Sequence, residues 1–242
     1  RFGKGTFTRR DALKIAGAAG VMAALPWSGI PEAEAAAPAL KGPQAGGYYR
    51  FSVGEIEAMV VSDGGLSFQP IQPTWAPEAS KEELEGNLRS AFLPTDRINL
   101  DVNTLLLKIG GELVLVDTGA GNLFGPTLGK MAERLAAAGV QPAQVTAVVI
   151  SHAHGDHFGG LLDGAGKPVF PNAAYFASKT EVDYWTGPEP DLSKLRVPPE
   201  DRKMFLDSAR RYLGAIKDRL TPVSPGQKIV PGLEVVSAPG HT

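Results

Sequence analysis

Ser151-His152-Ala153-His154-Gly155-Asp156-His157 is the stretch of this sequence that decides the fold. It places three histidines and one aspartate, all able to bind a metal, within six residues. Imidazole and carboxylate groups together suit Zn²⁺ and similar divalent ions. The fourth histidine of the chain, His241, lies near its end in Ala238-Pro239-Gly240-His241-Thr242. All four histidines therefore point to one predicted metal centre.

The cluster follows a short apolar run at residues 145–150, which reads as a buried strand. Gly155 and then Gly159-Gly160 follow, so we expect the ligands on a tight loop at the carboxyl end of that strand, where open α/β sheets bind ligands. His152 and His154 can grip one ion. Asp156 and His157 can then turn toward a second ion. Two ions about 3.5–4 Å apart could share a hydroxide and polarise an ester or phosphoryl oxygen.

The alternative is that these histidines are structural or simply exposed. The aspartate within the cluster, the preceding strand and the following glycines favour metal binding.

The His-x-His-x-Asp-His motif followed by Gly-Gly resembles that of the metallo-β-lactamase-fold hydrolases, as do Asp117-Thr118-Gly119 and Pro239-Gly240-His241-Thr242. Within that family the resemblance is strongest to methyl parathion hydrolase and related lactonases. The segments that carry it are Gly47-Tyr48-Tyr49-Arg50, Ser62-Asp63-Gly64, Leu123-Phe124-Gly125-Pro126-Thr127-Leu128-Gly129 and Phe170-Pro171-Asn172-Ala173. The resemblance runs from about Gly46 to Thr242. It implies an α/β fold, specifically the αβ/βα sandwich of the family.

The resemblance also implies roles for individual residues. His152, His154 and His241 would hold the first metal, and Asp156 and His157 the second. Asp156 would also help to orient the attacking hydroxide and so is the predicted catalytic residue. Asp117 would orient a ligand histidine, as carboxylates commonly do at zinc sites. Asp117 can also be read as an ordinary turn residue at a strand end.

Relatives use a bridging aspartate and a last histidine that would lie beyond Thr242. We therefore expect the chain to be a fragment of a longer reading frame, with the C-terminal part of the fold missing. A protein with a degenerate site is the alternative.

Residues 1–37 have the three parts of an export signal. Arg9-Arg10 is followed by an apolar stretch at residues 15–25 and by small residues at 33–37. The paired arginines resemble the twin-arginine type, which predicts the export machinery as a partner and an exported, periplasmic or secreted protein. The apolar stretch is too short for a confident membrane span. A cytoplasmic amphipathic helix is the alternative. Residues 38–47 are predicted to be a linker and residues 48–242 the metal-binding domain.

Composition agrees with a globular enzyme, with 43% apolar and 21% charged residues. The net charge is −2, and without residues 1–37 there remain 19 basic residues against 23 acidic ones. The sequence has no basic patch of the kind that binds nucleic acid, so we expect no nucleic-acid partner. Because the chain has no cysteine, a zinc site must use histidine and carboxylate. A homodimer is kept open as an assembly state.

The pattern along the chain predicts alternating strands and helices. We expect strands at 49–53, 56–62, 100–109, 112–116, 145–150, 173–177 and 233–237, a turn at 63–65, and helices at 80–91, 126–138 and 199–220.

The predicted function is a metal-dependent hydrolase of an ester-like bond in a phosphotriester, lactone or aryl ester, with two zinc ions and a metal-bound hydroxide. A β-lactamase or a thioester hydrolase of the glyoxalase II kind is the first alternative, and a non-catalytic metal-binding fragment the second. By resemblance, Phe124, Trp185 and Phe205 would line the substrate pocket; the alternative is ordinary core packing.

Overall fold

The computed structural model describes residues 40, 42, 44–193 and 199–241. The predicted export signal at residues 1–37 lies outside the described residues, as does part of the predicted linker. A seven-stranded mixed sheet forms the centre of the described domain, with its strands in the order of the sequence. The sheet confirms the predicted α/β class.

The first four strands of this sheet are antiparallel and the last four run parallel, with β4 common to both sets. The strands are β1 Tyr48–Val53, β2 Ile56–Phe68, β3 Ile98–Ile109, β4 Glu112–Val116, β5 Ala147–Ile150, β6 Ala174–Ser178 and β7 Leu220–Val223. A second, two-stranded sheet consists of β8 Lys228–Val230 and β9 Leu233–Glu234.

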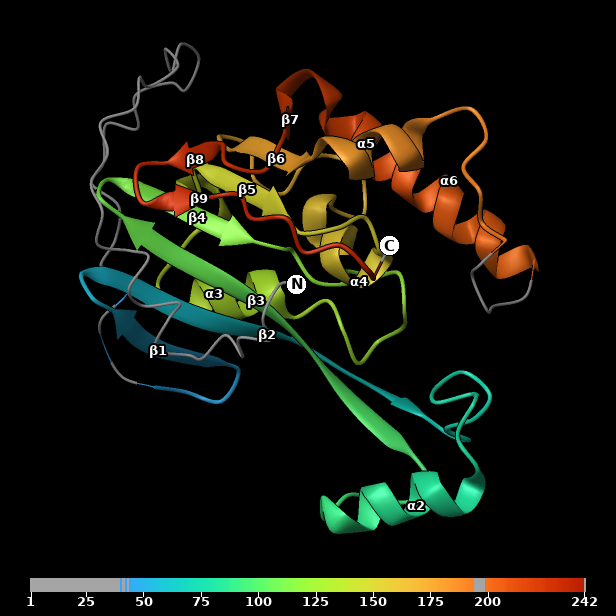
Figure 1. Cartoon of the computed structure of the whole chain (residues 1–242). Coiled ribbons are helices and arrows are strands. Elements are labelled where there is room, and N and C mark those ends of the chain that lie inside the picture. The colour runs from blue at the N-terminus through green and yellow to red at the C-terminus, as the bar shows by residue number, and fades with distance from the viewer. Residues whose placement is uncertain (1–39, 41, 43, 194–198, 242) are drawn as a thin grey trace, which may run out of the picture. The chain divides into compact units, whose positions relative to one another are not determined.

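The helices lie in the connections between strands. They are α2 Lys81–Ser90, α3 Met131–Ala137, α4 Gly155–Phe158, α5 Lys179–Thr186 and α6 Pro199–Ile216. In Figure 1, α5 and α6 lie beside β6 and β7, and α4 follows β5. None of the helices in the described part of the chain is long and apolar enough to span a membrane.

Each face of the main sheet has its own apolar core because side chains alternate along a strand. One face carries Leu106, Leu115 and Val148 and packs against Leu135 of α3 and Leu213 of α6. The other face carries Val114, Ala147 and Phe176, and packs against residues of the small sheet such as Ile229 and Val230.

Several predicted boundaries are wrong. The predicted turn at residues 63–65 is instead part of β2, which passes through a bulge between Ser62 and Gly64 and continues to Phe68. The helix predicted at 126–138 begins only at Met131, since Gly129 has a φ of 77° and breaks the helical backbone before it. The helix predicted at 199–220 ends at Ile216, and β9 ends at Glu234.

Asp63 lies at the bulge in β2 and connects this strand to the loop after β4. Its side chain is 1% exposed and accepts three backbone hydrogen bonds, from Ala120 and Gly129 through Oδ2 and from Met131 through Oδ1. The carboxylate therefore ties β2 to the loop that follows β4 and satisfies the first amide of α3, which has no partner within the helix. This connection holds the loop that carries Asp117 and Phe124.

Candidate metal centre

The candidate site lies where parallel strands end. Asp117 follows β4 directly, residues 151–157 follow β5, and α5 follows β6. Ligand sites in open α/β sheets form at these carboxyl ends, so the fold brings the predicted ligands together there as expected.

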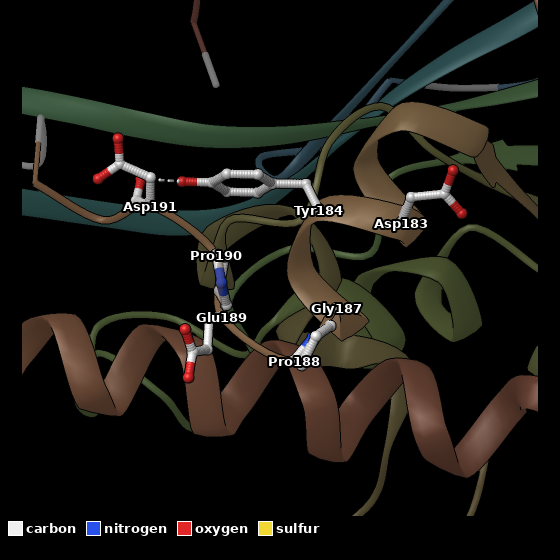
Figure 2. A pocket seen from close by; sticks show the side chains of 7 residues that line it. All are labelled: Asp183, Tyr184, Gly187, Pro188, Glu189, Pro190 and Asp191. Carbon is white, nitrogen blue, oxygen red and sulfur yellow. Dashed lines mark hydrogen bonds between the residues drawn. The ribbon is translucent and has the colours of Figure 1, made fainter.

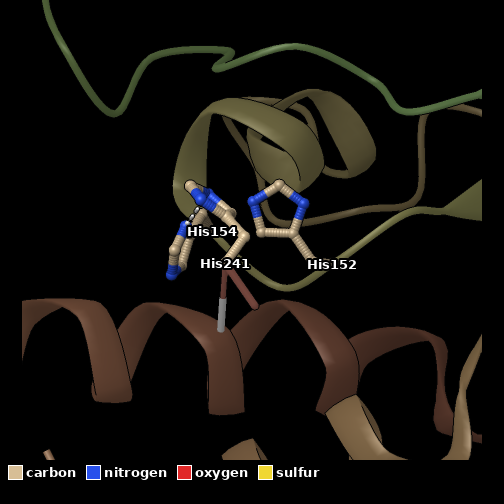
Figure 3. Close-up of side chains that lie close together, drawn as sticks. All are labelled: His152, His154 and His241. Atoms are coloured by element: carbon tan, nitrogen blue, oxygen red, sulfur yellow. Dashed lines mark hydrogen bonds between the residues drawn. The ribbon is translucent and has the colours of Figure 1, made fainter. Parts of the chain in front are cut away.

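Three of the predicted ligands converge on one point. One ring nitrogen from each of His152, His154 and His241 can be chosen so that the three lie within 4.8 Å of one another. His154 Nδ1 and His241 Nε2 are 3.2 Å apart, and Figure 3 shows the three imidazoles facing a common space. Three histidine nitrogens are a familiar ligand set for catalytic zinc, which keeps its remaining position open.

The state of His152 fits a metal ligand. Its Nδ1 lies 3.0 Å from the hydroxyl of Ser151, whereas its Nε2 is buried and has no hydrogen-bond partner. A buried polar atom without a partner is costly, and a divalent ion at this nitrogen would remove that cost. The donor set therefore fits the metal that the motif predicts.

The other two predicted ligands, Asp156 and His157, adjoin the three-histidine cluster. The rings of His152 and His157 have centroids 4.0 Å apart, and Asp156 Oδ2 lies 3.4 Å from His157 Nε2. His157 Nδ1 lies 2.7 Å from Asp117 Oδ2. With Nδ1 donating to Asp117, Nε2 is left to face Asp156. Among the described residues, no third side chain joins Asp156 and His157 to form a three-ligand group.

Asp117 connects several parts of the site. Its Oδ1 accepts the backbone N–H of Ser151 at 2.8 Å, and its Oδ2 accepts the Ser151 hydroxyl at 2.8 Å besides contacting His157. Its backbone has a φ of 59°, an unusual value for a residue other than glycine that aspartate tolerates better than most. This strained turn aims the carboxylate at the loop after β5.

The environment separates the pKa values of the two adjacent histidines. Burial, and then the positive charges of His157, His154 and His241, lower the pKa of His152 to about 4. Burial also acts to lower the pKa of His157, but hydrogen bonds to Asp117 and Asp156 outweigh it and raise that pKa to about 9. Without metal, His152 is therefore neutral at pH 7, whereas His157 is protonated on both ring nitrogens and positively charged.

Burial and the neighbouring His241 lower the pKa of His154, against the opposing charges of Asp156 and Glu181. For Asp156, burial acts to raise the pKa, but the hydrogen bond and charge of His157 lower it overall. Burial thus favours the neutral form of His152 and His154, and His157 favours the ionised form of Asp156, which are the forms in which these groups bind a metal.

The metal loop is more regular than predicted. Residues 155–158 form the short helix α4, with His154 at its N-cap, where an open loop was expected. The Gly159-Gly160 pair allows close packing: a Cβ at Gly159 would lie 2.0 Å from the carbonyl oxygen of Ala120, and one at Gly160 would lie 2.0 Å from that of Thr118. The glycines therefore let α4 approach the loop after Asp117.

The three predicted pocket residues have different environments. The half-buried rings of Phe124 and Phe205 have centroids 6.5 Å apart, and a Cβ placed on Gly155 would lie 3.0 Å from the Phe124 ring. Trp185 is 1% exposed within α5, and its ring lies edge-on to His154 at 5.8 Å. Phe124 therefore borders α4 and pairs with Phe205, while Trp185 lies beside the ligand His154.

Two residues of the site received no role from the sequence. Ser151 joins Asp117 to His152, and its position directly before the motif was the only signal for it. Glu181 on α5 accepts the backbone N–H of Ala153 at 2.9 Å, although 28 residues separate them. No local pattern marks Glu181, because the contact depends on the packing of α5 against the metal loop.

A separate cavity of about 450 Å³ lies at the end of α5. It is lined by Asp183, Tyr184, Gly187, Pro188, Glu189, Pro190 and Asp191 (Figure 2). Tyr184 Oη donates to the carbonyl oxygen of Asp191 at 2.6 Å across it. None of its lining residues is a predicted ligand, and its three carboxylates do not suit an anionic substrate.

Comparisons with known proteins agree with this geometry. Residues 97–242 match the family described as the metallo-beta-lactamase superfamily, and a search of curated proteins found no match. AidC, described as a dizinc quorum-quenching lactonase, is 30% identical, with a TM-score of 0.72 over 76% of this chain and 64% of its own. The hydrolase AbOPH of the beta lactamase superfamily is 25% identical, with a TM-score of 0.67 over 77% and 64%.

A probable metal-dependent hydrolase from Staphylococcus aureus is 20% identical, with a TM-score of 0.57 over 75% of this chain and 63% of its own, and shares the fold. The chain thus spans about 64% of the length of the first two solved structures that it matches. The match to the family covers more than half of the chain and includes all the predicted metal ligands. The chain therefore belongs to the metallo-β-lactamase superfamily.

Proposed function

We propose that this protein is a zinc-dependent hydrolase of ester-like bonds and that its substrates are lactones. The observation that carries the proposal is the convergence of His152, His154 and His241 on one point, with Nε2 of His152 buried and unpartnered. The likeness to AidC, a dizinc lactonase at 30% identity, favours a lactone over the other ester-like substrates.

Each predicted ligand would have a separate role at the metal centre. His152, His154 and His241 would bind the first ion as neutral imidazoles. Asp156 and His157 would bind the second, and Asp117 would hold His157 by its Nδ1 so that Nε2 faces the ion. When bound, the ions would supply Lewis acidity toward the carbonyl oxygen and lower the pKa of water.

Asp156 is proposed as the residue that both ligates and orients the nucleophile. Its carboxylate is kept ionised by His157 and lies next to the three-histidine cluster. A carboxylate in this position can accept a hydrogen bond from the attacking water and hold it in one direction.

The surroundings of α4 favour a substrate with an apolar part. Phe124 and Phe205 form a half-buried aromatic pair next to Gly155. Rings of this kind bind apolar chains or aromatic groups by excluding water from them. We propose that this pair receives the acyl or aryl portion of the substrate, while Trp185 supports His154 from within the core.

A side-by-side assay tests the proposed function. The purified protein would be stripped with a chelator, reconstituted with Zn²⁺ and given an N-acyl homoserine lactone, a phosphotriester, an aryl ester, a thioester and a β-lactam. We expect lactone turnover that disappears with the chelator and returns with zinc, and that His241→Ala abolishes. Preferred turnover of the β-lactam or thioester would instead favour the alternative hydrolase classes.

We also propose that residues 1–37 direct export through the twin-arginine route. The support for this is the Arg9-Arg10 pair followed by an apolar stretch and small residues.

A further inference from the structure

The backbone between two metal ligands is held by a residue outside the motif. Ala153, which separates His152 from His154, is 3% exposed, and its N–H donates to Glu181 Oε2 at 2.9 Å. Glu181 belongs to α5, which follows the next strand of the sheet. The hydrogen bond therefore ties the metal loop after β5 to the helix after β6.

The same carboxylate oxygen is held by a second donor. Trp185 Nε1 donates to Glu181 Oε2 at 3.0 Å, four residues along the same helix. The Trp185 ring is buried and meets the His154 ring edge-on at 5.8 Å. One face of α5 thus contacts both the peptide between the two histidines and one of the imidazoles.

We propose that Glu181 is a positioning residue that fixes the separation and orientation of His152 and His154 toward the metal, with Trp185 holding the Glu181 carboxylate in place. This inference rests on the proposed metal site but not on the proposed substrate. Glu181 is not among the proposed metal ligands. It acts by fixing the Ala153 peptide, and a rotation of that peptide would turn the two flanking imidazoles apart.

The contacts with Ala153 and Trp185 require a side chain as long as that of Glu181. Oε2 has to reach from α5 to the Ala153 amide while remaining within reach of Trp185. Glu181→Gln keeps this reach and an oxygen that can accept both N–H groups. Glu181→Asp keeps the charge but is one methylene shorter, so its carboxylate falls short of Ala153.

Cobalt titration of the full chain separates these two properties. Co²⁺ in place of Zn²⁺ gives a visible spectrum that reports ligand geometry. We expect Glu181→Ala and Glu181→Asp to weaken Co²⁺ binding about 10- to 100-fold and to change the spectrum. Glu181→Gln should keep both the Co²⁺ affinity and the spectrum near those of the parent. Asp183→Ala, which removes an exposed carboxylate that pairs with Lys179 on the same helix, is the matched control and should change neither.

Opposite results would overturn the inference. If Glu181→Asp matches the parent and Glu181→Gln does not, Glu181 acts through its charge. If all three variants lower the unfolding temperature of the metal-free protein but leave cobalt affinity and spectrum unchanged, its role is structural only. Should Glu181→Ala fail to fold, the order of the Asp and Gln variants still decides. A parent protein that binds cobalt but hydrolyses no lactone would contradict the proposed function and leave this test intact.

Discussion

Removing the Asp63 carboxylate should destabilise the domain far more than removing a comparable carboxylate from the surface. Asp63 is 1% exposed and accepts the backbone N–H groups of Ala120, Gly129 and Met131 at 2.9–3.0 Å. The bonds from Ala120 and Met131 are buried, whereas Gly129 is exposed, so water can replace its bond. The cost of a substitution therefore comes mainly from two of the three bonds.

The magnitude follows from those two bonds. A hydrogen bond to a charged acceptor contributes roughly 1.5–3 kcal/mol, so Asp63→Ala should lower the free energy of unfolding by about 3–6 kcal/mol. This is a large part of the roughly 5–15 kcal/mol that stabilises a typical domain. Asp63→Asn can keep its oxygen on Ala120 and Gly129 but then points its NH₂ at the N–H of Met131. It should therefore lose about 1.5–3 kcal/mol.

Urea unfolding followed by circular dichroism measures these differences. Asp163 provides the matched control, because its carboxylate also accepts two backbone N–H groups, from Ala165 and Lys167 at 2.9 Å, but is exposed. Asp163→Ala, which also removes every bond that its carboxylate accepts, should stay within about 0.5 kcal/mol of the parent, as surface substitutions usually do. Equal losses for Asp63→Ala and Asp163→Ala would refute the reasoning, since burial would then make no difference.

Three further predictions concern the metal and export. His152→Ala should lose the tightly bound ion and the esterase activity, because it leaves two ligands in a three-histidine site; unchanged metal content by elemental analysis would contradict the ligand assignment. Asp117→Asn should weaken binding of the second ion about 10- to 100-fold and binding of the first ion less, because the Asp117 carboxylate holds His157. A zinc titration in which both affinities fall equally would contradict this. Arg9→Lys with Arg10→Lys should leave the protein in the cytoplasm upon cell fractionation, because the twin-arginine receptor reads the guanidinium pair; normal export would indicate a general signal.

The sequence predicted correctly those elements whose ends depend on contacts within a few residues. The helix after Ser80 is confirmed because Ser80 accepts the N–H of Glu83 in a side-chain cap, a contact within four residues. The hairpin of β3 and β4 is confirmed because Gly110 takes a φ of 61° at the turn. The error at residues 63–65 arose where distant groups contact the segment. Residues 63–65 look like a turn, but the bonds from Ala120, Gly129 and Met131 to Asp63 accompany an extended, bulged strand there.

The sequence by itself determined the chemistry of the site: which residue types can bind a metal and that a strand delivers most of them together. Spacing within six residues is a local property, so the His152–His157 cluster was readable without the fold. Only the tertiary structure decided which contacts support those ligands. Asp117 was predicted to hold a ligand histidine, and packing selected His157. Glu181 carried no signal at all, because its contact with Ala153 exists only once parallel strands β5 and β6 bring their following segments to the same edge of the sheet.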